Sequence, residues 1–284
     1  HNPKHETLNL IFNFIKSVLF LYELRKSKLY IVEGGLFVFI SLFIIFFFRN
    51  SKLAFNIADP FLFKSNNKIY SKIKYRIKIW FLNRCDYVFT NSPMVYRDLE
   101  NEKLCSSLYH YRLDIAQDLM RENHLPHNAS TKILYCVTRP KETGYIKGLD
   151  QAIDIVKSSD RKNDFIFAGS DDFSFTSDNL TKKGFVNDLS ELFKISKVLL
   201  CPSAYDSYPG VTIECIKYGV IPIVSDQCGS SHDLIKIDTN LVAKYSHTDE
   251  WVNKINIVLN YSDDDYRKLV FNLSKLYNKF YKHE

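Results

Sequence analysis

The sequence predicts an α/β protein made of two Rossmann-like domains, each a parallel sheet with helices packed on its faces. Two observations lead to this prediction. Short apolar strands recur along the chain without the apolar–polar alternation of a half-exposed sheet, and helical stretches separate them. At 284 residues the chain is also long enough for two domains of ordinary size. Ligands of such sheets bind at the carboxyl ends of the strands.

The strand–helix alternation is most regular in the second half of the chain, from Thr131 onward. Strands are predicted at 132–137, 165–168, 184–186, 198–201, 220–225 and 241–245. Helices are predicted at 149–157, 189–195 and 211–218, with a helical turn at 231–235. The continuous apolar character of these strands predicts a doubly wound sheet that is covered on both faces.

The first half repeats this pattern less completely. Strands are predicted at 29–32, 53–57 and 87–90, the last followed by the turn Asn91-Ser92-Pro93. The polar, proline-containing segment 123–130 is predicted to be an interdomain linker. The expected domains are therefore residues 1–128 and 129–284.

Leu36–Phe48 is an uninterrupted apolar run of thirteen residues, LFVFISLFIIFFF. A helix that spans a bilayer needs about 20 such residues. We therefore interpret this run as a buried element of the first domain, and keep a membrane-inserted hairpin as the alternative.

Charge is distributed unevenly along the chain. Residues 1–130 hold 18 Lys and Arg against 11 Asp and Glu, a balance of +7, whereas 131–284 hold 20 against 21, a balance of −1. The basic excess of the first half indicates either an ordinary solvated surface or an anionic partner there, such as a phospholipid surface or a pyrophosphate-bearing substrate. The six cysteines form no CxxC pair, and no signal peptide is visible. We expect a cytoplasmic protein, with peripheral attachment to the inner face of the membrane as an option.

The segment Lys68–Arg84 reads as a basic helix. Apolar residues recur at Ile69, Ile73, Ile77 and Trp80/Phe81, and Lys68, Lys72 and Arg76 form a ridge beside them. Two interpretations have equal weight. In the first, the helix packs on the sheet with a solvated basic face. In the second, it lies at an anionic membrane surface.

Several residues have the chemistry that a nucleotide diphosphate sugar requires. Its phosphates need cationic side chains and free backbone N–H groups at a helix N-terminus, and its ribose needs a carboxylate. Tyr208-Pro209-Gly210 leads into the predicted helix, in whose first turn Glu214 is expected. Asp206 lies eight positions before Glu214, in the loop after a strand. Arg139 and Lys147 follow another strand of the same predicted sheet.

These residues carry a resemblance to a known family. The pattern PS-x-x-D-S-Y-P-G-x-x-x-E, followed by Gly219–Pro222 and Ser225-Asp226, resembles the signature of the retaining glycosyltransferases of the GT-B fold, family four. Val137-Thr138-Arg139 and Lys147-Gly148 are similar to the family's Arg … Lys-Gly element. The resemblance covers 131–284 closely and 29–100 weakly.

The resemblance implies a role for each matching position. Arg139 and Lys147 would neutralise the donor diphosphate, Asp206 would bind the transferred sugar, and Glu214 would bind the ribose. Arg139, Lys147 and Asp206 would form the catalytic group. The remaining donor-binding positions would be Gly169, Val186, Tyr208, Pro209, Gly210, Val211 and Thr212. Neither a metal nor a cofactor is expected, because Arg and Lys supply the positive charge, and the donor is a UDP- or GDP-linked sugar. Asp263-x-Asp265 is interpreted as the acidic first turn of a helix rather than a metal site.

Some positions depart from the family pattern. Asp206 replaces the commoner Glu, Pro209 and Cys228 stand where glycine is usual, and Asp233 comes one place later than the expected acid. In the first half, Ala58-Asp59 stands where many relatives have His-Asp. No strand with a glycine-rich loop is found before Leu29, so we expect an amino-terminal domain that is reduced or incomplete.

Taken with the resemblance, the sequence predicts a GT-B enzyme that transfers a sugar with retention to a glycan or polyprenyl-linked acceptor, in cell-surface polysaccharide synthesis. The alternative is a non-catalytic subunit that binds the nucleotide sugar within a glycosyltransferase complex. A Rossmann oxidoreductase is disfavoured because no strand is followed by G-x-G-x-x-G. No nucleic-acid partner is expected.

Overall fold

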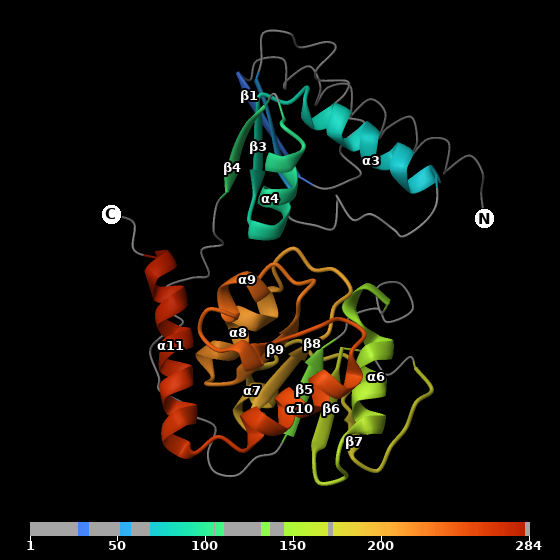
Figure 1. Ribbon diagram of the computed structural model, residues 1–284, viewed down its shortest axis with the longest axis vertical. Coiled ribbons are helices and arrows are strands. Elements are labelled where there is room, and N and C mark those ends of the chain that lie inside the picture. Colours follow the sequence, from blue (N-terminus) through green and yellow to red (C-terminus); the bar gives the residue numbers. More distant parts are fainter. Residues whose placement is uncertain are drawn as a thin grey trace, which may run out of the picture. The chain divides into compact units, whose positions relative to one another are not determined.

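The computed structural model describes residues 28–33, 52–57, 69–104, 106–110, 132–136, 145–169 and 173–281. Figure 1 shows two compact units. Of the described residues, 28–33, 52–57, 69–90, 99–104 and 106–109 belong to the first unit, and 91–98, 110, 132–136, 145–169 and 173–281 belong to the second. The apolar run 36–48, the linker 123–130 and the predicted boundary after Asn128 lie outside the described residues.

The first unit contains a four-stranded sheet in the order β1-β2-β3-β4. Its strands are β1 (Leu29–Glu33), β2 (Lys52–Ile57), β3 (Tyr87–Thr90) and β4 (Ser107–His110), and β1, β2 and β3 pair in parallel. Two helices accompany these strands along the chain, α3 (Ile69–Leu82) and α4 (Pro93–Asn101). The three predicted strands are confirmed. Strand β4 was missed because its side chains alternate between exposed and half-buried, so it has no apolar run.

The turn after β3 begins a helix in the way that its sequence predicts. The Ser92 hydroxyl accepts a hydrogen bond from the backbone N–H of Val95 at 3.3 Å, and the Ser92 carbonyl accepts one from Tyr96 at 2.9 Å. A serine in this position satisfies an N–H that the helix itself leaves unpaired. Ser92 therefore caps α4.

The second unit contains a six-stranded sheet in the order β10-β9-β8-β5-β6-β7, in which every neighbouring pair is parallel. The strands are β5 (Lys132–Cys136), β6 (Asp164–Ala168), β7 (Leu180–Lys182), β8 (Val198–Cys201), β9 (Ile221–Ser225) and β10 (Val242–Ala243). From β5 the chain builds outward through β6 and β7, then crosses to β8 and builds outward on the other side. The topological switch point therefore lies between β5 and β8, where doubly wound sheets bind their ligands.

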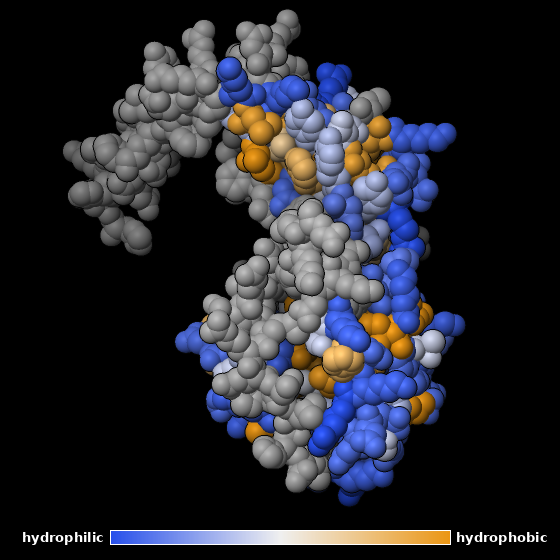
Figure 2. All heavy atoms as spheres, turned by 90° about the vertical axis from the view of Figure 1, so that its left-hand side faces the viewer, coloured by the Kyte–Doolittle hydropathy of each residue, from blue (hydrophilic) through white to orange (hydrophobic). Residues whose placement is uncertain are grey.

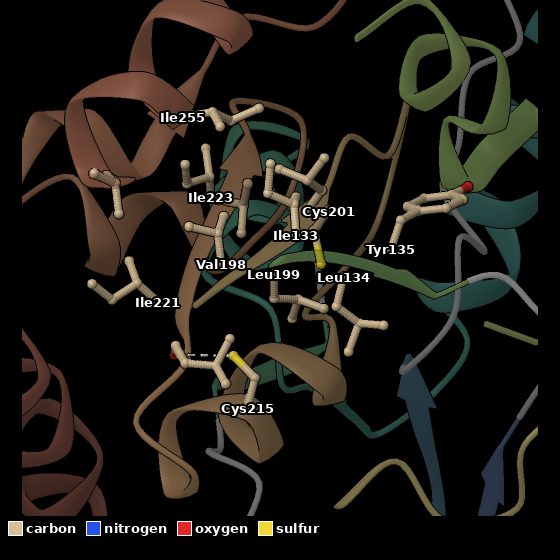
Figure 3. Close-up of a cluster of buried hydrophobic side chains, with 14 of the residues drawn as sticks. Ile133, Leu134, Tyr135, Val198, Leu199, Cys201, Cys215, Ile221, Ile223 and Ile255 are labelled. Atoms are coloured by element: carbon tan, nitrogen blue, oxygen red, sulfur yellow. Dashed lines mark hydrogen bonds between the residues drawn. The ribbon is translucent and has the colours of Figure 1, made fainter. Parts of the chain in front are cut away.

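Helices cover both faces of this sheet. They are α6 (Leu149–Ser158), α7 (Ser190–Ile195), α8 (Gly210–Lys217), α9 (Ser231–Leu234), α10 (Thr248–Leu259) and α11 (Asp263–Tyr281). Helix α6 packs against α10, and α8 against α11. Figure 3 shows Ile255 of α10 on the same face as Ile133 and Ile223, and Cys215 of α8 on the opposite face. The α/β class with parallel sheets is thus confirmed.

Two predicted strands of the second unit are corrected. The strand expected at 184–186 is irregular, and the sheet ends instead with β7, which pairs with β6. Gly184 has a φ of 62°, a left-handed conformation that ends an extended strand. The strand expected at 241–245 is reduced to β10, because Thr239–Leu241 forms a 3₁₀ turn. Asp238 caps this turn by accepting a hydrogen bond from Asn240 N–H at 2.8 Å.

None of the helices among the described residues is both long enough and apolar enough to span a bilayer. The apolar run 36–48 lies outside those residues.

We expect Leu199→Ala to destabilise the protein strongly. Leu199 is fully buried in β8 between two strands of the core, so truncation removes apolar contacts and leaves a cavity that costs about 2–5 kcal/mol. Urea unfolding followed by circular dichroism measures the loss. The control is Ile195→Ala, at a side chain that is 40% exposed. An equal loss for the two variants would contradict the assigned packing of β8.

Candidate functional site

The carboxyl ends of β5 and β8 bring a lysine and an aspartate together. Lys147 follows β5 and Asp206 lies in the loop after β8, and Lys147 Nζ is 2.5 Å from Asp206 Oδ2. The Asp206 side chain is only 10% exposed, whereas the Lys147 side chain is 42% exposed. An ion pair from two residues 59 positions apart thus lies at the switch point of the sheet.

Three contacts fix the backbone on which Lys147 lies. Gly148 has a φ of 72°, and a Cβ added there would lie 1.8 Å from the carbonyl oxygen of Pro202, so only glycine fits. The N–H of Ala204 donates to the Ile146 carbonyl at 2.8 Å. The hydroxyl of Tyr135, from β5, donates to the Lys147 carbonyl at 3.1 Å. Gly148 therefore allows the turn that carries Lys147 to pack against the loop after β8.

The charge state of Lys147 follows from two opposing effects. Partial burial alone would lower the pKa of its ammonium group, but the charge of Asp206 and the hydrogen bond to it raise the pKa by more. The net pKa lies above the ordinary lysine value. Lys147 therefore remains positively charged throughout the neutral pH range, as an anion-binding lysine must.

Asp206 is fixed by the loop that follows β9. Its N–H donates to the Gln227 carbonyl at 3.2 Å, its carbonyl accepts from Gly229 N–H at 2.9 Å, and it forms a parallel bridge with Cys228. A Cβ added at Gly229 would lie 1.7 Å from the Ser207 carbonyl oxygen. Position 229 must therefore be glycine for the loop after β9 to pack this closely on Ser207.

The departure from the family pattern at Cys228 fits the same packing. The Cys228 side chain is buried and its sulfur lies 3.5 Å from Ser225 Oγ and 3.7 Å from the Cys201 carbonyl oxygen. Burial, aided by the nearby charge of Asp206, raises the pKa of this thiol to about 12. Cys228 is therefore a neutral packing residue next to the Asp206 backbone, since the thiolate is the reactive form of cysteine.

Helix α8 begins one residue earlier than the sequence predicts, at Gly210. Pro209 caps it, because the Pro209 carbonyl accepts from Thr212 N–H at 3.1 Å and from Thr212 Oγ1 at 2.6 Å. Glu214 consequently opens the second turn of α8, a correction of the first-turn position expected for it.

The negative charge of Glu214 nevertheless affects the carboxyl end of β5. Its side chain is exposed, and a Cβ added at Gly210 would lie 4.0 Å from Glu214 Oε1, so the carboxylate lies near the start of its own helix. The pKa of the Cys136 thiol, at the end of β5, is raised to about 12 by burial and further by the negative charge of Glu214. Glu214 is therefore close to the strand end that also precedes Lys147.

The expected contacts of Gly169 and Val186 lie at the end of β6. Gly169 N–H donates to the Gly184 carbonyl at 2.7 Å, which joins this strand end to the segment Gly184–Val186. Val186 is partly buried against the core, and the preceding Phe185 is 72% exposed. The carboxyl edge of the sheet thus extends from β6 across β5 to β8.

One contact of the site was missed by sequence reasoning. The Tyr208 hydroxyl donates to Asp233 Oδ2 at 3.4 Å, and Lys236 Nζ lies 4.0 Å from Asp233 Oδ1. Asp233 is buried in α9 and is the acid that the sequence shows one place later than the family pattern. The sequence shows both Asp233 and Tyr208. Their contact depends on how the loop from β8 to α8 folds toward α9.

The remaining predicted positions are Arg139 and the two acids Asp263 and Asp265. Arg139 lies outside the described residues. Asp263 and Asp265 lie in the first turn of α11, where Ser262 Oγ accepts from Asp265 N–H at 3.1 Å, so the interpretation as a helix start is confirmed. Within the described parts of the chain, no three His, Cys, Asp or Glu side chains are arranged to hold a metal ion.

Comparison with known families identifies the second unit. Residues 121–272, more than half of the chain, match the family model of glycosyl transferases group 1. The chain belongs to this family. No curated protein sequence matches it significantly.

Solved structures of glycosyltransferases share the fold of this family member. Sucrose-phosphate synthase from Thermosynechococcus elongatus is 16% identical with a TM-score of 0.73, and the match covers 93% of this chain and 72% of that one. HepE from Anabaena, in complex with UDP and glucose, is 13% identical with a TM-score of 0.73, and the match covers 93% of this chain and 77% of HepE.

The UDP-forming trehalose-phosphate synthase from Burkholderia xenovorans, in complex with glucose-6-phosphate, is 11% identical with a TM-score of 0.70, covering 92% and 71%. At these identities the shared property is the fold. The predicted GT-B architecture of two Rossmann-like domains is confirmed, and the chain is a glycosyltransferase of group 1.

Gly148→Ala and Gly184→Ala form a matched pair that tests the close packing under Lys147. Both glycines have a left-handed φ, 72° and 62°, but the added Cβ at Gly184 meets nothing within 4 Å. We expect Gly184→Ala to cost about 1–2 kcal/mol of backbone strain, and Gly148→Ala to cost clearly more because it also collides with Pro202. Urea unfolding compares them. Equal costs would show that the loop after β8 can move away from Gly148 freely.

Proposed function

We propose that this glycosyltransferase transfers a sugar from a nucleotide diphosphate sugar, with retention, to a glycan or lipid-linked acceptor in cell-surface polysaccharide synthesis. The observation that carries the donor assignment is the Lys147–Asp206 ion pair of 2.5 Å at the switch point of the sheet. A diphosphate sugar presents phosphate oxygens and sugar hydroxyls side by side, and an ammonium next to a carboxylate is complementary to that sequence of groups.

Each part of the donor has a matching group in the proposed complex. Lys147 binds the diphosphate, together with Arg139 and the backbone N–H groups at the start of α8. Asp206 accepts hydrogen bonds from the hydroxyls of the transferred sugar. Glu214, farther along α8, accepts from the ribose hydroxyls. Gly169 and Val186 border the base at the end of β6, and Tyr208–Thr212 line the sugar and phosphates.

Catalysis in this proposal is electrostatic. The bond between the sugar anomeric carbon and the diphosphate oxygen breaks, and that oxygen keeps the electron pair. The acceptor hydroxyl oxygen forms the new bond to the anomeric carbon, and its proton passes to the released diphosphate. Negative charge therefore grows on the diphosphate, where Lys147 is already positive and fixed by Gly148. Preorganised charge at the leaving group is commonly the largest single contribution to the rate. Retention is proposed from the spacing of Asp206 and Glu214, which follows the family-four signature.

The donor assignment predicts different losses for the two acids. Glu214→Ala should weaken both UDP and UDP-sugar binding by about 10- to 100-fold, because hydrogen bonds to a charged group contribute about 1.5–3 kcal/mol. Asp206→Asn should leave UDP binding intact or tighter, because it removes the negative charge that pairs with Lys147, yet abolish sugar transfer. Thermal shift and calorimetry with UDP-, GDP- and ADP-sugars measure binding.

Glu191→Ala, at an exposed acid on α7, is the matched control and should change neither property. If no nucleotide sugar stabilises the wild-type protein, the donor site itself is wrong. If donors bind but neither transfer nor donor hydrolysis occurs with any acceptor, the non-catalytic subunit is the better assignment.

A metal-independent reaction is a separate prediction. Because Lys147 and Arg139 are proposed to supply the positive charge at the diphosphate, transfer should continue unchanged in excess EDTA. The measurement is the release of nucleotide diphosphate with and without the chelator. Loss of transfer that added Mg²⁺ or Mn²⁺ restores would show that a divalent cation, and not these side chains alone, neutralises the leaving group.

A further inference from the structure

Helix α3 turns an apolar stripe away from the first unit. Ile73, Ile77 and Trp80 recur at the i, i+4, i+7 spacing of one helix face and are 52%, 56% and 44% exposed. The next two residues, Phe81 and Leu82, are fully buried. Phe81 packs edge-on against Phe55 of β2, with ring centroids 5.0 Å apart.

Both interpretations of the segment stay open. Helix α3 packs on the sheet through Phe81 and Arg76 is exposed, as the first interpretation expects, but Ile73 and Ile77 are exposed as well, which only the second interpretation expects. Scattered exposed apolar residues are normal on a protein surface, but a continuous stripe on one helix is typical of a docking surface.

The charged residues of the helix itself have a single sign. The fourteen residues of α3 contain four basic residues and neither Asp nor Glu, and no acid occurs anywhere from residue 60 to 85. Arg76 is exposed next to Ile77, and the Arg84 guanidinium lies 5.0 Å from the centre of the Trp80 ring. Glu102 contacts α3, and its carboxylate accepts a 2.6 Å hydrogen bond from the Tyr75 hydroxyl. Tyr75 is two positions from both Ile73 and Ile77, which places it on the other side of the helix.

We propose that α3 docks on the surface of an anionic lipid bilayer, with Ile73, Ile77 and Trp80 inserted and the basic side chains against the headgroups. Aliphatic and aromatic side chains rimmed by Lys and Arg are the features of an interfacial helix, and Trp favours the headgroup region. A second copy of this chain is a poor occupant, because two acid-free basic helices would repel each other across the interface. An anionic bilayer complements both the apolar stripe and its charge.

This docking goes beyond the proposed function and needs no donor, because α3 belongs to the first unit and the donor residues belong to the second. It does narrow the acceptor class. An enzyme attached to a membrane through this helix would meet acceptors that are themselves anchored in that membrane.

The chain carries its own reporter of this docking. It has two tryptophans, of which Trp80 is 44% exposed in the stripe and Trp251 is fully buried. Vesicles of equal parts phosphatidylglycerol and phosphatidylcholine should shift the tryptophan emission to shorter wavelength and protect it from iodide quenching. Phosphatidylcholine vesicles alone should do so far less. In Trp80→Phe the shift should vanish while the emission of Trp251 persists.

Matched variants separate apolar and charged contributions in a vesicle co-sedimentation assay. Ile73→Ser/Ile77→Ser should weaken binding by about tenfold or more. Its control is Ile195→Ser/Ile235→Ser, at isoleucines of the second unit that are 40% and 46% exposed. Arg76→Gln should weaken binding to anionic vesicles by about fivefold, whereas Arg161→Gln, also exposed, should not. Circular dichroism verifies that each variant is folded.

Three results would overturn the docking proposal. The first is a folded wild-type protein whose emission does not respond to anionic vesicles. The second is equal weakening by the α3 variants and their controls. The third is a shift that rises with protein concentration in the absence of lipid, which would identify a second copy as the occupant. UDP-sugar binding measured on the same samples reports the donor site separately, so failure of one proposal is distinguishable from failure of the other.

Discussion

Two glycines allow neighbouring segments to pack closely against the loop after β8, one on each side of it. Gly148 lies against the Pro202 carbonyl on one side, and Gly229 lies against the Ser207 carbonyl on the other. A methyl group at either position would occupy the space of a backbone oxygen, which cannot yield as a flexible side chain can. Asp206 lies between these two contacts, so its carboxylate has little freedom, and Lys147 meets it from the turn that Gly148 permits. The backbone packing at these glycines thus positions Lys147 and Asp206, and their ion pair follows from it.

The electrostatics of the site depend on this arrangement. Lys147 is protonated because Asp206 outweighs the effect of burial, so the ammonium charge is present before any ligand arrives. The neighbouring thiols of Cys136 and Cys228 have raised pKa values and stay neutral, so they add no charge to this edge of the sheet. In the proposed donor complex, this arrangement matches a ligand with alternating anionic and hydroxyl groups. It also positions charge in advance of a leaving group, which is where a glycosyltransferase needs it.

The two units present contrasting surfaces. In the second unit, the exposed large apolar side chains among the described residues, such as Ile195, Phe185 and Phe271, come from different helices and loops. In the first unit, apolar side chains are exposed on strands as well as on α3, among them Leu29, Ile31 and Tyr109. On the face of that unit seen in Figure 2, apolar residues form separate groups with pale and hydrophilic residues between them. The stripe on α3 differs from these because basic residues alone accompany it along the helix.

The sequence by itself determined the α/β class, most strands of the second unit and the residues of the donor signature. Continuous apolar runs and glycine-bounded turns are local patterns, and they predicted β5, β6 and β8 to within a residue. Prediction from the sequence failed where a tertiary contact outweighed the local pattern. Strand β7 forms only by pairing with the edge of β6, and the Tyr208–Asp233 contact joins the loop before α8 to helix α9. The outward direction of Ile73 and Ile77 was likewise invisible, because helical periodicity shows that a stripe exists and only packing against β2 decides which side of the helix is buried.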